Sequence, residues 1–358
     1  MKILHVITSL QTGGAEKLLV DSVPLYQEKG LSVDVLSLLN RRTAFWTILE
    51  KYTTGKVFGL TLKSVYNPIL VFKLIPYLRK YDLIHVHLFP ALYWVVIAKW
   101  LSFSKTAIVY TEHNTDNKRR HNPVLRSIDR LIYRGVARIV TIASEVDLKL
   151  KAHLQYKENK YYLINNGVDV NFFSKANALP KKQFFSENNF ILIQVSSFRN
   201  QKDQQTVIKS LTYLPESICL LLVGEGILLP ECESIVKELQ LNHRVKFLGI
   251  RTDIPQLLKT ADIVVLSSRH EGLSLSSIEG MACAPFIASN VPGLREVVEG
   301  AGLLFEQGNS EELARHILKL YQDKAYYQQI ADQCLERAKQ FDINRMIDSY
   351  IKIYEQYI

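Results

Sequence analysis

The sequence of 358 residues is poor in cysteine, glycine and proline. Its four cysteines stand singly and form no C-x-x-C pair, which excludes a zinc ribbon, a thioredoxin-type redox motif and a disulfide framework. The 16 Gly and 11 Pro are too few for a collagen-like or low-complexity chain. Because unpaired thiols persist in a reducing compartment, we expect a cytoplasmic protein.

Long hydrophobic runs are also absent. The longest apolar stretch, residues 89–101, has 13 residues and includes Lys99, whereas about 20 apolar residues are needed to cross a bilayer. Near the N-terminus, His5 and Thr8 interrupt the apolar run, so we expect no signal peptide. The sequence therefore predicts no transmembrane helix.

Positive charge is concentrated in the first half, with 24 Lys and Arg against 13 Asp and Glu in residues 1–170, and 20 against 22 in the remainder. The densest basic segment contains Lys118, Arg119, Arg120, Arg126, Arg130 and Arg134. The last three recur every four residues, which places them on one helical face. This pattern suits an anionic partner, such as a membrane surface that would hold the protein peripherally, and it equally suits a solvated helix face. We expect no nucleic-acid partner, because aromatic residues do not alternate with the basic ones.

Apolar runs of strand length alternate with amphipathic runs of helix length along most of the chain. Strands are predicted in the first half at residues 2–8, 31–39, 83–87, 107–112, 138–143 and 161–164. After a polar stretch the alternation restarts, with strands predicted at residues 190–196, 218–223, 245–248, 262–266, 286–289 and 303–305. The sequence therefore predicts an α/β protein with two Rossmann-like, doubly wound domains, residues 1–170 and 171–342, facing one another across a cleft. Residues 310–358 are predicted to form three helices with no further strand.

The loop after the first predicted strand contains Gly13 and Gly14 just before a helix. Glycines there let the backbone approach a phosphate, and the helix N-terminus offers free N–H donors, although a plain tight turn explains the pair equally well. The loop does not match G-x-G-x-x-G, and Asn40 stands where a dinucleotide site needs an acid. No G-x-x-x-x-G-K-[ST] motif occurs. A dehydrogenase and a P-loop nucleotidase are both disfavoured.

In the second half, Arg199 and Lys202 follow the strand at residues 190–196. Ligands of parallel sheets bind at the carboxyl ends of strands, so these cations could hold a phosphate. A solvated surface pair is the alternative.

The most informative segment, residues 268–279, follows another predicted strand and opens a helix. The amides of Gly272, Leu273 and Ser274 could meet a phosphate there. Glu271 and Glu279 suit a ligand that also carries hydroxyl groups, because a carboxylate accepts two hydrogen bonds from a diol. Ordinary acids at a helix start are the alternative.

With this segment, the chain resembles the retaining GT-B glycosyltransferases usually numbered family 4. The strongest match is the E-x7-E motif, Glu271 to Glu279. Further matches follow the family's order: Gly13-Gly14-Ala15-Glu16, Ile84-His85-Val86-His87, Thr111-Glu112-His113, Asn166-Gly167-Val168-Asp169, Arg199 with Lys202, Val223-Gly224-Glu225-Gly226, and Pro292-Gly293-Leu294-Arg295-Glu296.

The resemblance implies a role for each matching residue. The family's catalytic positions correspond to His113, Arg199, Lys202 and Glu271, of which the two cations contact the donor diphosphate and Glu271 lies against the donor sugar. Donor-binding positions correspond to Gly13, Gly14, Gly224, Gly272, Leu273, Ser274 and Glu279, and Glu279 would hold the ribose hydroxyls. Ile250 and Arg251 are the expected nucleobase contacts. The family's terminal helix crosses back onto the first domain, and residues 343–358 would do so here.

The resemblance further implies retention of configuration with a UDP- or GDP-sugar donor. The donor phosphate takes the acceptor's proton, and the protein positions the substrates and stabilises the leaving diphosphate. The sequence contains no Asp-x-Asp motif and no histidine cluster suited to Mg²⁺ or Mn²⁺, so we expect no metal and no cofactor. The expected acceptor is a glycan or a lipid-linked sugar of a surface polysaccharide.

Two departures from the family pattern affect loops near the donor. The run from Gly280 to Pro285 is one residue shorter than usual, and Ser197-Phe198 precedes Arg199 where the family commonly has glycine. Alternatives of the same fold are a nucleotide-sugar epimerase, which needs no acceptor, and a nucleotide-sugar binding module without turnover. A glycan phosphorylase is disfavoured because it needs a much longer chain.

Overall fold

The computed structural model describes residues 1–11, 13–114, 122–155 and 160–357. The chain forms two compact units, of which the first comprises Met1–Gly167 together with Ile343–Ile358 and the second comprises Val168–Asp342. Of the basic segment, Lys118, Arg119 and Arg120 lie outside the described residues. Within the described ranges, no helix is both long and apolar enough to span a membrane.

The first unit contains a parallel sheet of seven strands in the order β3-β2-β1-β4-β5-β6-β7. Its strands are β1 (Lys2–Ile7), β2 (Ser32–Leu39), β3 (Val57–Thr61), β4 (Leu83–His87), β5 (Ala107–Glu112), β6 (Arg138–Thr141) and β7 (Tyr161–Leu163). The sequence-based set lacked β3 and the preceding helix α2 (Ala44–Tyr52). β3 lies at the sheet edge with all five residues only half-buried, so it shows neither the apolar run of a central strand nor a clear alternation.

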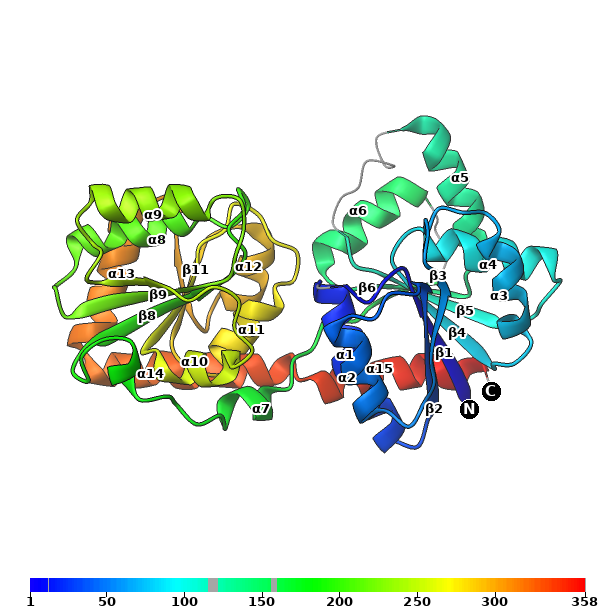
Figure 1. Cartoon of the computed structure of the whole chain (residues 1–358), viewed down its shortest axis with the longest axis horizontal. Helices are drawn as coiled ribbons and strands as arrows, with labels where there is room; N and C mark the ends of the chain where they lie inside the picture. The colour runs from blue at the N-terminus through cyan, green and yellow to red at the C-terminus, as the bar shows by residue number, and fades with distance from the viewer. Residues whose placement is uncertain (12, 115–121, 156–159, 358) are drawn as a thin grey trace. The chain divides into compact units, whose positions relative to one another are not determined.

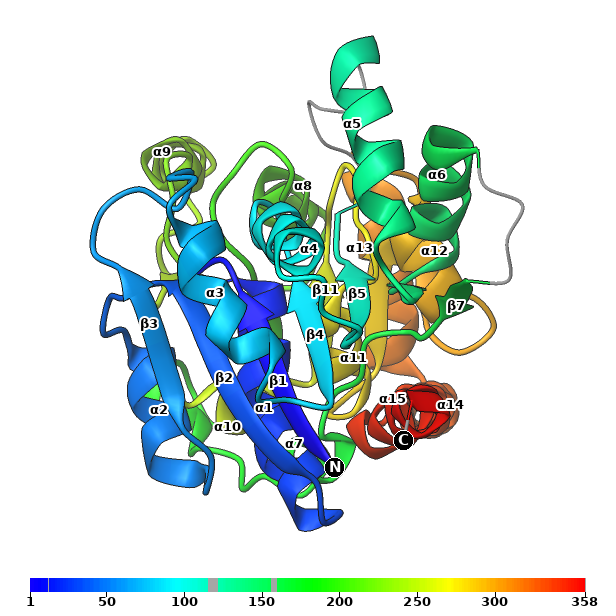
Figure 2. The ribbon, with the colours of Figure 1, turned by 90° about the vertical axis from the view of Figure 1, so that its right-hand side faces the viewer.

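Helices cover both faces of this sheet (Figure 2). One face carries α3 (Leu70–Leu78), α4 (Ala91–Leu101), α5 (Pro123–Arg134) and α6 (Ser144–Leu154), and the other carries α1 (Gly14–Glu28), α2 and α15 (Ile343–Tyr354). The last helix packs Met346, Ile347 and Tyr350 into the same core as β1 and α1, because its apolar residues recur every three or four positions. Both ends of the chain therefore belong to one unit.

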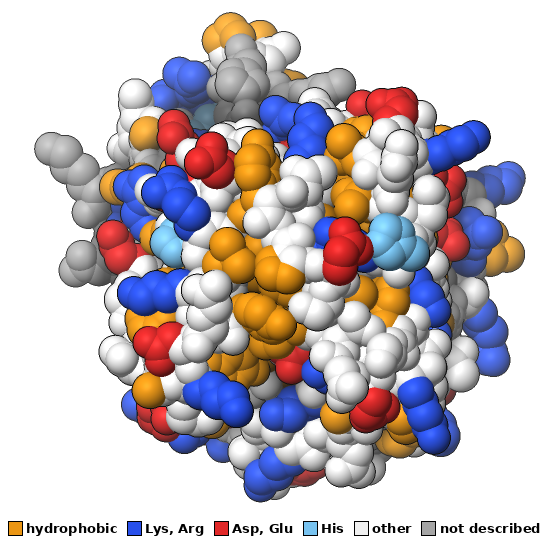
Figure 3. Space-filling model, turned by 90° about the vertical axis from the view of Figure 1, so that its left-hand side faces the viewer, with side chains coloured by type: hydrophobic (Ala, Val, Ile, Leu, Met, Phe, Trp, Pro, Cys, Tyr) orange, Lys and Arg blue, Asp and Glu red, His pale blue; other side chains and the backbone are white. Residues whose placement is uncertain are grey.

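The second unit contains a parallel sheet of six strands in the order β10-β9-β8-β11-β12-β13 (Figure 1). Its strands are β8 (Phe190–Val195), β9 (Ile218–Val223), β10 (Val245–Phe247), β11 (Ile263–Leu266), β12 (Phe286–Ser289) and β13 (Leu303–Phe305). Its helices are α7 (Val170–Ser174), α8 (Gln204–Ser210), α9 (Leu229–Glu238), α10 (Ile254–Thr260), α11 (Leu275–Met281), α12 (Pro292–Val298), α13 (Ser310–Gln322) and α14 (Lys324–Gln340). Figure 3 looks onto one side of this unit, where side chains of both charges surround a central hydrophobic group.

Each sheet reverses its strand order at one point, and a ligand site is expected there. In the first unit the reversal lies between β1 and β4, and in the second it lies between β8 and β11. The loops and side chains at the carboxyl ends of these four strands are therefore the place to look for chemistry.

Candidate active site

Two loops of the second unit are joined at the carboxyl ends of β8 and β11. Lys202 and Ser268 form an antiparallel bridge, and the Asp203 N–H donates to the Ser267 carbonyl at 3.0 Å. The Arg269 N–H donates to the Gln201 carbonyl at 2.8 Å. The loop that carries the two predicted cations and the loop that carries Glu271 therefore lie side by side, although 69 residues separate Lys202 from Glu271 in the sequence.

Lys202 and Glu271 form an ion pair between Nζ and Oε1. Their side chains are only 14% and 8% exposed, so water screens the pair weakly. The Ser268 hydroxyl donates to the same carboxylate oxygen at 2.7 Å, which fixes the Glu271 side chain. Two residues that were predicted separately as catalytic are thus in direct contact with one another.

Arg199 differs from Lys202 although both were predicted to hold phosphate. It lies in the turn that the Lys202 N–H closes by donating to the Arg199 carbonyl at 2.8 Å, and its side chain is exposed. Within the described part of the chain, its guanidinium has neither an ion-pair nor a hydrogen-bond partner. It remains available for an anion.

The predicted phosphate amides precede α11, whose N-cap is Ser274. Among the described residues, the N–H groups of Gly272, Leu273 and Ser274 donate no hydrogen bond. The first turn of α12 supports this loop closely, since a Cβ on Gly293 would lie 2.1 Å from the Gly272 carbonyl oxygen. Glycine at position 293 is therefore required for the packing of the loop.

Glu279 lies within α11 and is 7% exposed. The next residue, Gly280, explains how this helix can pack directly on the sheet: a Cβ there would lie 2.7 Å from side-chain atoms of Phe286 and Val264. Because Gly280 has no side chain, α11 packs close to β11 and β12, and Glu279 lies close to them as well.

The loop after β9 approaches the loop after β8 very closely. Gly224 has φ +131°, and a Cβ there would lie 2.2 Å from the Ser196 carbonyl oxygen. Of the predicted nucleobase residues, Ile250 is 72% exposed, while the Arg251 guanidinium donates to both carboxylate oxygens of Asp253 at 2.8 and 2.6 Å. The Arg251 side chain is thus engaged within its own loop.

The remaining predicted residues lie in the first unit. Gly13 caps α1 and Gly14 is its first residue. A Cβ on Gly14 would meet nothing within 4 Å, and the atoms nearest to one on Gly13 would be those of the Glu16 carboxylate. The fold itself therefore has no need of glycine at position 14. His113 follows β5 and is half-buried.

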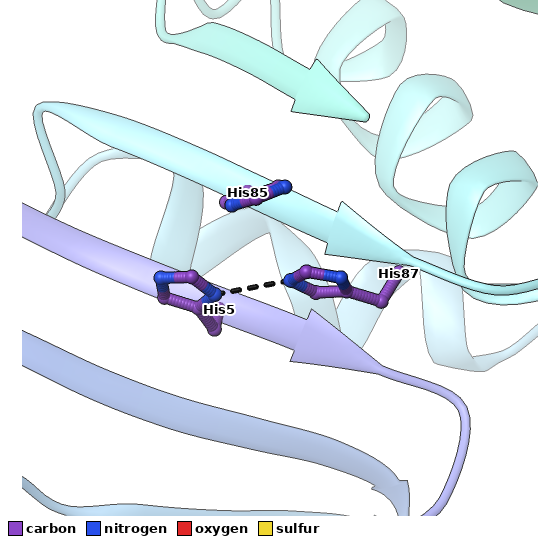
Figure 4. A group of neighbouring side chains, drawn as sticks. All are labelled: His5, His85 and His87. Atoms are coloured by element: carbon purple, nitrogen blue, oxygen red, sulfur yellow. Dashed lines mark hydrogen bonds between the residues drawn. The ribbon is translucent and has the colours of Figure 1, made fainter. Parts of the chain in front are cut away.

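Sequence reasoning missed a group of histidines around the reversal between β1 and β4 (Figure 4). His5 pairs with His85 in the β1–β4 register, and His87, two residues further, points to the same face. The Nδ1 of His5 lies 3.0 Å from Nε2 of His87, whose Nδ1 lies 3.1 Å from Nε2 of His113. The alternating Ile84-His85-Val86-His87 was the signal in the sequence, but only the strand pairing adds His5.

Burial keeps these imidazoles neutral. It lowers the pKa of His5 to about 3 and that of His113 to about 4, and it lowers the pKa values of His85 and His87 well below the ordinary value. Ring nitrogens of His5, His85 and His87 lie within 4.8 Å of one another, close enough to share a metal ion. The fit to a metal is poor, however, because both nitrogens of His85 are already bonded, to the hydroxyls of Tyr354 at 2.6 Å and Thr111 at 2.7 Å.

Comparison with known proteins identifies the family. The model of the family described as Glycosyltransferase Family 4 matches residues 12–172, and that of Glycosyl transferases group 1 matches residues 175–340. The N-acetyl-alpha-D-glucosaminyl L-malate synthase of Bacillus anthracis is 30% identical over 286 residues, which are 76% of this chain and 74% of that protein. The chain belongs to the GT-B glycosyltransferases of family 4.

This family 4 glycosyltransferase has further relatives that act on nucleotide sugars or bind them. The UDP-Gal:alpha-D-GlcNAc-diphosphoundecaprenol alpha-1,3-galactosyltransferase of Escherichia coli is 25% identical over 72% of its length and 74% of this chain. The crystal structure of Anabaena HepE in complex with UDP superposes with a TM-score of 0.86 and 26% identity, covering 99% of this chain and all of that one. The predicted family, α/β fold class and glycosyltransferase activity are confirmed.

Proposed function

We propose that this glycosyltransferase transfers a sugar from a UDP-sugar to a hydroxyl of a lipid-linked glycan, with retention of configuration and without a metal ion or cofactor. The observation that carries the proposal is the exposed Arg199, whose guanidinium has no partner among the described residues, next to the partly buried Lys202–Glu271 pair at the strand reversal of the second unit. The UDP complex of the similar HepE supports uracil as the base.

In this proposal Arg199 and Lys202 neutralise the diphosphate as it leaves. Charge builds up on that group in the transition state, so cations positioned beside it stabilise the transition state more than the ground state. The amides of Gly272, Leu273 and Ser274, which donate to no other group in the described ranges, would add hydrogen bonds to the same group. Glu271 would move from Lys202 to the hydroxyls of the donor sugar, and Glu279 would hold the ribose.

Retention and metal independence are inferred from chemistry. The similar E. coli enzyme is named for an alpha-1,3 product made from UDP-Gal, and UDP-galactose is itself an α-glycoside. Two cations replace the charge that a divalent ion would supply, and no Asp-x-Asp motif occurs in the sequence. We assign His113 and the Gly13-Gly14 loop to contacts with the sugar and the acceptor.

A lipid-linked acceptor requires the enzyme to work at a membrane, and α5 has the surface for it. Val124, Ile128 and Leu131 are 66%, 40% and 52% exposed and recur at helical spacing, which gives a solvent-facing apolar stripe. Arg126 and Arg134 of the same helix are also exposed. We propose that this helix rests on an anionic lipid surface at the cytoplasmic face, with its apolar stripe in the interface and its arginines at the head groups.

Vesicle sedimentation tests this contact. We expect the protein to pellet with phosphatidylglycerol vesicles but weakly with phosphatidylcholine vesicles, and less as the salt concentration rises. Ile128→Ser with Leu131→Ser should release it, whereas Tyr213→Ser, a change at a 53% exposed apolar residue of the second unit, should not. Equal binding of both variants would refute the assignment to α5.

The reaction itself is tested with UDP-sugars and a short-chain lipid diphosphate sugar in EDTA. We expect an acceptor-dependent product whose anomeric proton coupling in NMR gives an α-linkage. A β-linked product would refute retention, and dependence on added Mg²⁺ would refute metal independence. A free, epimerised sugar formed from the donor alone would instead identify an epimerase, and nucleotide binding without any product would identify a binding module.

A further inference from the structure

His113 is the end of a hydrogen-bonded chain of three imidazoles. His87 bridges His113 and His5 through its two ring nitrogens, with N···N distances of 3.1 and 3.0 Å. Figure 4 shows the link between His5 on β1 and His87 at the end of β4. At the inner end, Nε2 of His5 is buried and has no hydrogen-bond partner in the described part of the chain, and His5 is 1% exposed.

A neutral imidazole carries one N–H, so the chain has only two complete arrangements. In the first, Nδ1–H of His5 donates to His87 and Nδ1–H of His87 donates to His113, which leaves the His113 proton on its own Nδ1. In the second, every proton sits on Nε2 and the bonds run the other way. Lowered pKa values keep all three rings neutral near neutral pH, so the choice is between tautomers and not between charges.

The inner end of the histidine chain, Nε2 of His5, decides which of the two proton arrangements is more stable. The first leaves Nε2 of His5 as a bare lone pair, whereas the second leaves a buried N–H without an acceptor. Orphaned buried N–H groups are the rarer and costlier defect. We propose that His5 and His87 are positioning residues that fix His113 as the Nδ1–H tautomer and thereby make its outer nitrogen a hydrogen-bond donor.

His85 lies beside this chain without belonging to it. Its ring centroid is 4.1 Å from that of His87, but its two nitrogens bond Tyr354 and Thr111. A change at Thr111 therefore disturbs the neighbouring network without breaking the chain, which makes Thr111→Val the matched control.

The consequence for catalysis rests on the proposed function, in which His113 contacts the sugar or the acceptor. Among the described residues, Nδ1 of His113 has no hydrogen-bond partner, so the donor would be directed to a substrate oxygen. A donor at this position can hold a hydroxyl or ring oxygen, and it cannot remove the acceptor's proton. This limit on His113 agrees with the proposal that the donor phosphate is the base that takes the acceptor's proton.

Two-bond ¹H–¹⁵N correlation spectra of histidine-labelled protein test the tautomers directly in the free enzyme. We expect His5, His87 and His113 all to carry the proton on Nδ1, with signals assigned by their loss in single variants. Nε2–H in His87 and His113, or averaged shifts in both, would overturn the proposal. In folded His87→Phe we expect His113 to revert to a mixture of tautomers, whereas Thr111→Val should leave it unchanged.

Activity measurements on variants then distinguish a failure of this tautomer proposal from a failure of the proposed function. His87→Phe should lower kcat roughly tenfold, as for one lost hydrogen bond, with little change in the KM for donor. A wild-type spectrum with the expected tautomers but full activity in His113→Phe would leave the imidazole chain standing and refute the role of His113 in catalysis. Unchanged tautomers in His87→Phe would refute the chain even if activity fell.

Discussion

Gly14 and Gly224 lack side chains for different reasons, and substitution separates them. Gly14→Ala should leave the free energy of unfolding within about 0.5 kcal/mol of wild type, because its Cβ meets no atom within 4 Å. If the loop lies against the donor, activity falls all the same. Gly224→Ala should cost roughly 1–3 kcal/mol through its positive φ and its contact with Ser196. Urea unfolding and kinetics of both variants check this, and full activity in Gly14→Ala would remove that glycine from the site.

The partly buried Lys202–Glu271 pair predicts that stability and activity respond differently to substitution. Lys202→Met should destabilise the second unit by roughly 1–3 kcal/mol, because it leaves the Glu271 carboxylate, only 8% exposed, without its cation. Adding Glu271→Gln should restore most of the stability but none of the activity, which should stay 10²–10³-fold lower. Thermal unfolding and initial rates measure both effects. Recovery of activity in the double variant would show that neither charge acts on the substrate.

Unlike Lys202, Arg199 is expected to matter for activity but not for stability. Arg199→Ala should reduce activity about as much as Lys202→Met while leaving stability within about 0.5 kcal/mol, because the exposed side chain has no partner among the described residues. Lys209→Ala, at another exposed cation of the same unit, is the control and should change neither quantity. Normal turnover by Arg199→Ala would contradict the donor assignment.

The sequence could name Arg199, Lys202 and Glu271 because each belongs to a motif with its own local spacing. It could not show that Lys202 and Glu271 pair, because that contact depends on two loops brought together by β8 and β11. The histidine chain was hidden for the same reason, since His5 and His87 come together only when β1 pairs with β4.

At the scale of secondary structure elements, the histidines of β1 and β4 make the stability of the first unit sensitive to acid. The pKa of His5 is lowered from 6.5 to about 3, so the unfolded chain binds a proton more readily than the folded one. Stability is therefore full above pH 6.5 and is lost as the pH falls toward 3. Between pH 6.5 and 5, His5 alone should account for a loss on the order of 2 kcal/mol.

Unfolding free energies measured at several pH values between 5 and 6.5 test this. His5→Phe should flatten the dependence, while His270→Asn, at an exposed histidine of the second unit, should not. An unchanged slope in His5→Phe would show that burial does not hold this imidazole neutral.

Strands and helices with a strong apolar period were predictable, and weakly patterned elements were not. α15 was expected as one of the three helices of residues 310–358, and its buried apolar residues recur at helical spacing. β3 and α2 were missed because the half-buried edge strand carries little hydrophobic signal and contains Gly59.

At the scale of the whole molecule, the chain begins and ends in the same unit. Ile347→Ala in α15 should therefore destabilise the first unit by about 2–5 kcal/mol, because the side chain is fully buried. Hydrogen exchange should show lost protection in β1 and α1 but not in β8 and β9. Lys352→Ala, at an exposed residue of the same helix, is the control. Uniform loss of protection in both units would contradict the assignment of α15 to the first unit alone.

The central claim is that Arg199, Lys202, Glu271 and Glu279 form a metal-free site for a nucleoside diphosphate. Calorimetric titration of UDP into the protein in EDTA tests it most directly, with GDP and ADP as competitors. We expect saturable binding of UDP that Arg199→Ala weakens at least tenfold and Lys209→Ala leaves unchanged. Binding that appears only after Mg²⁺ is added, or that is equally strong in Arg199→Ala, would contradict the account.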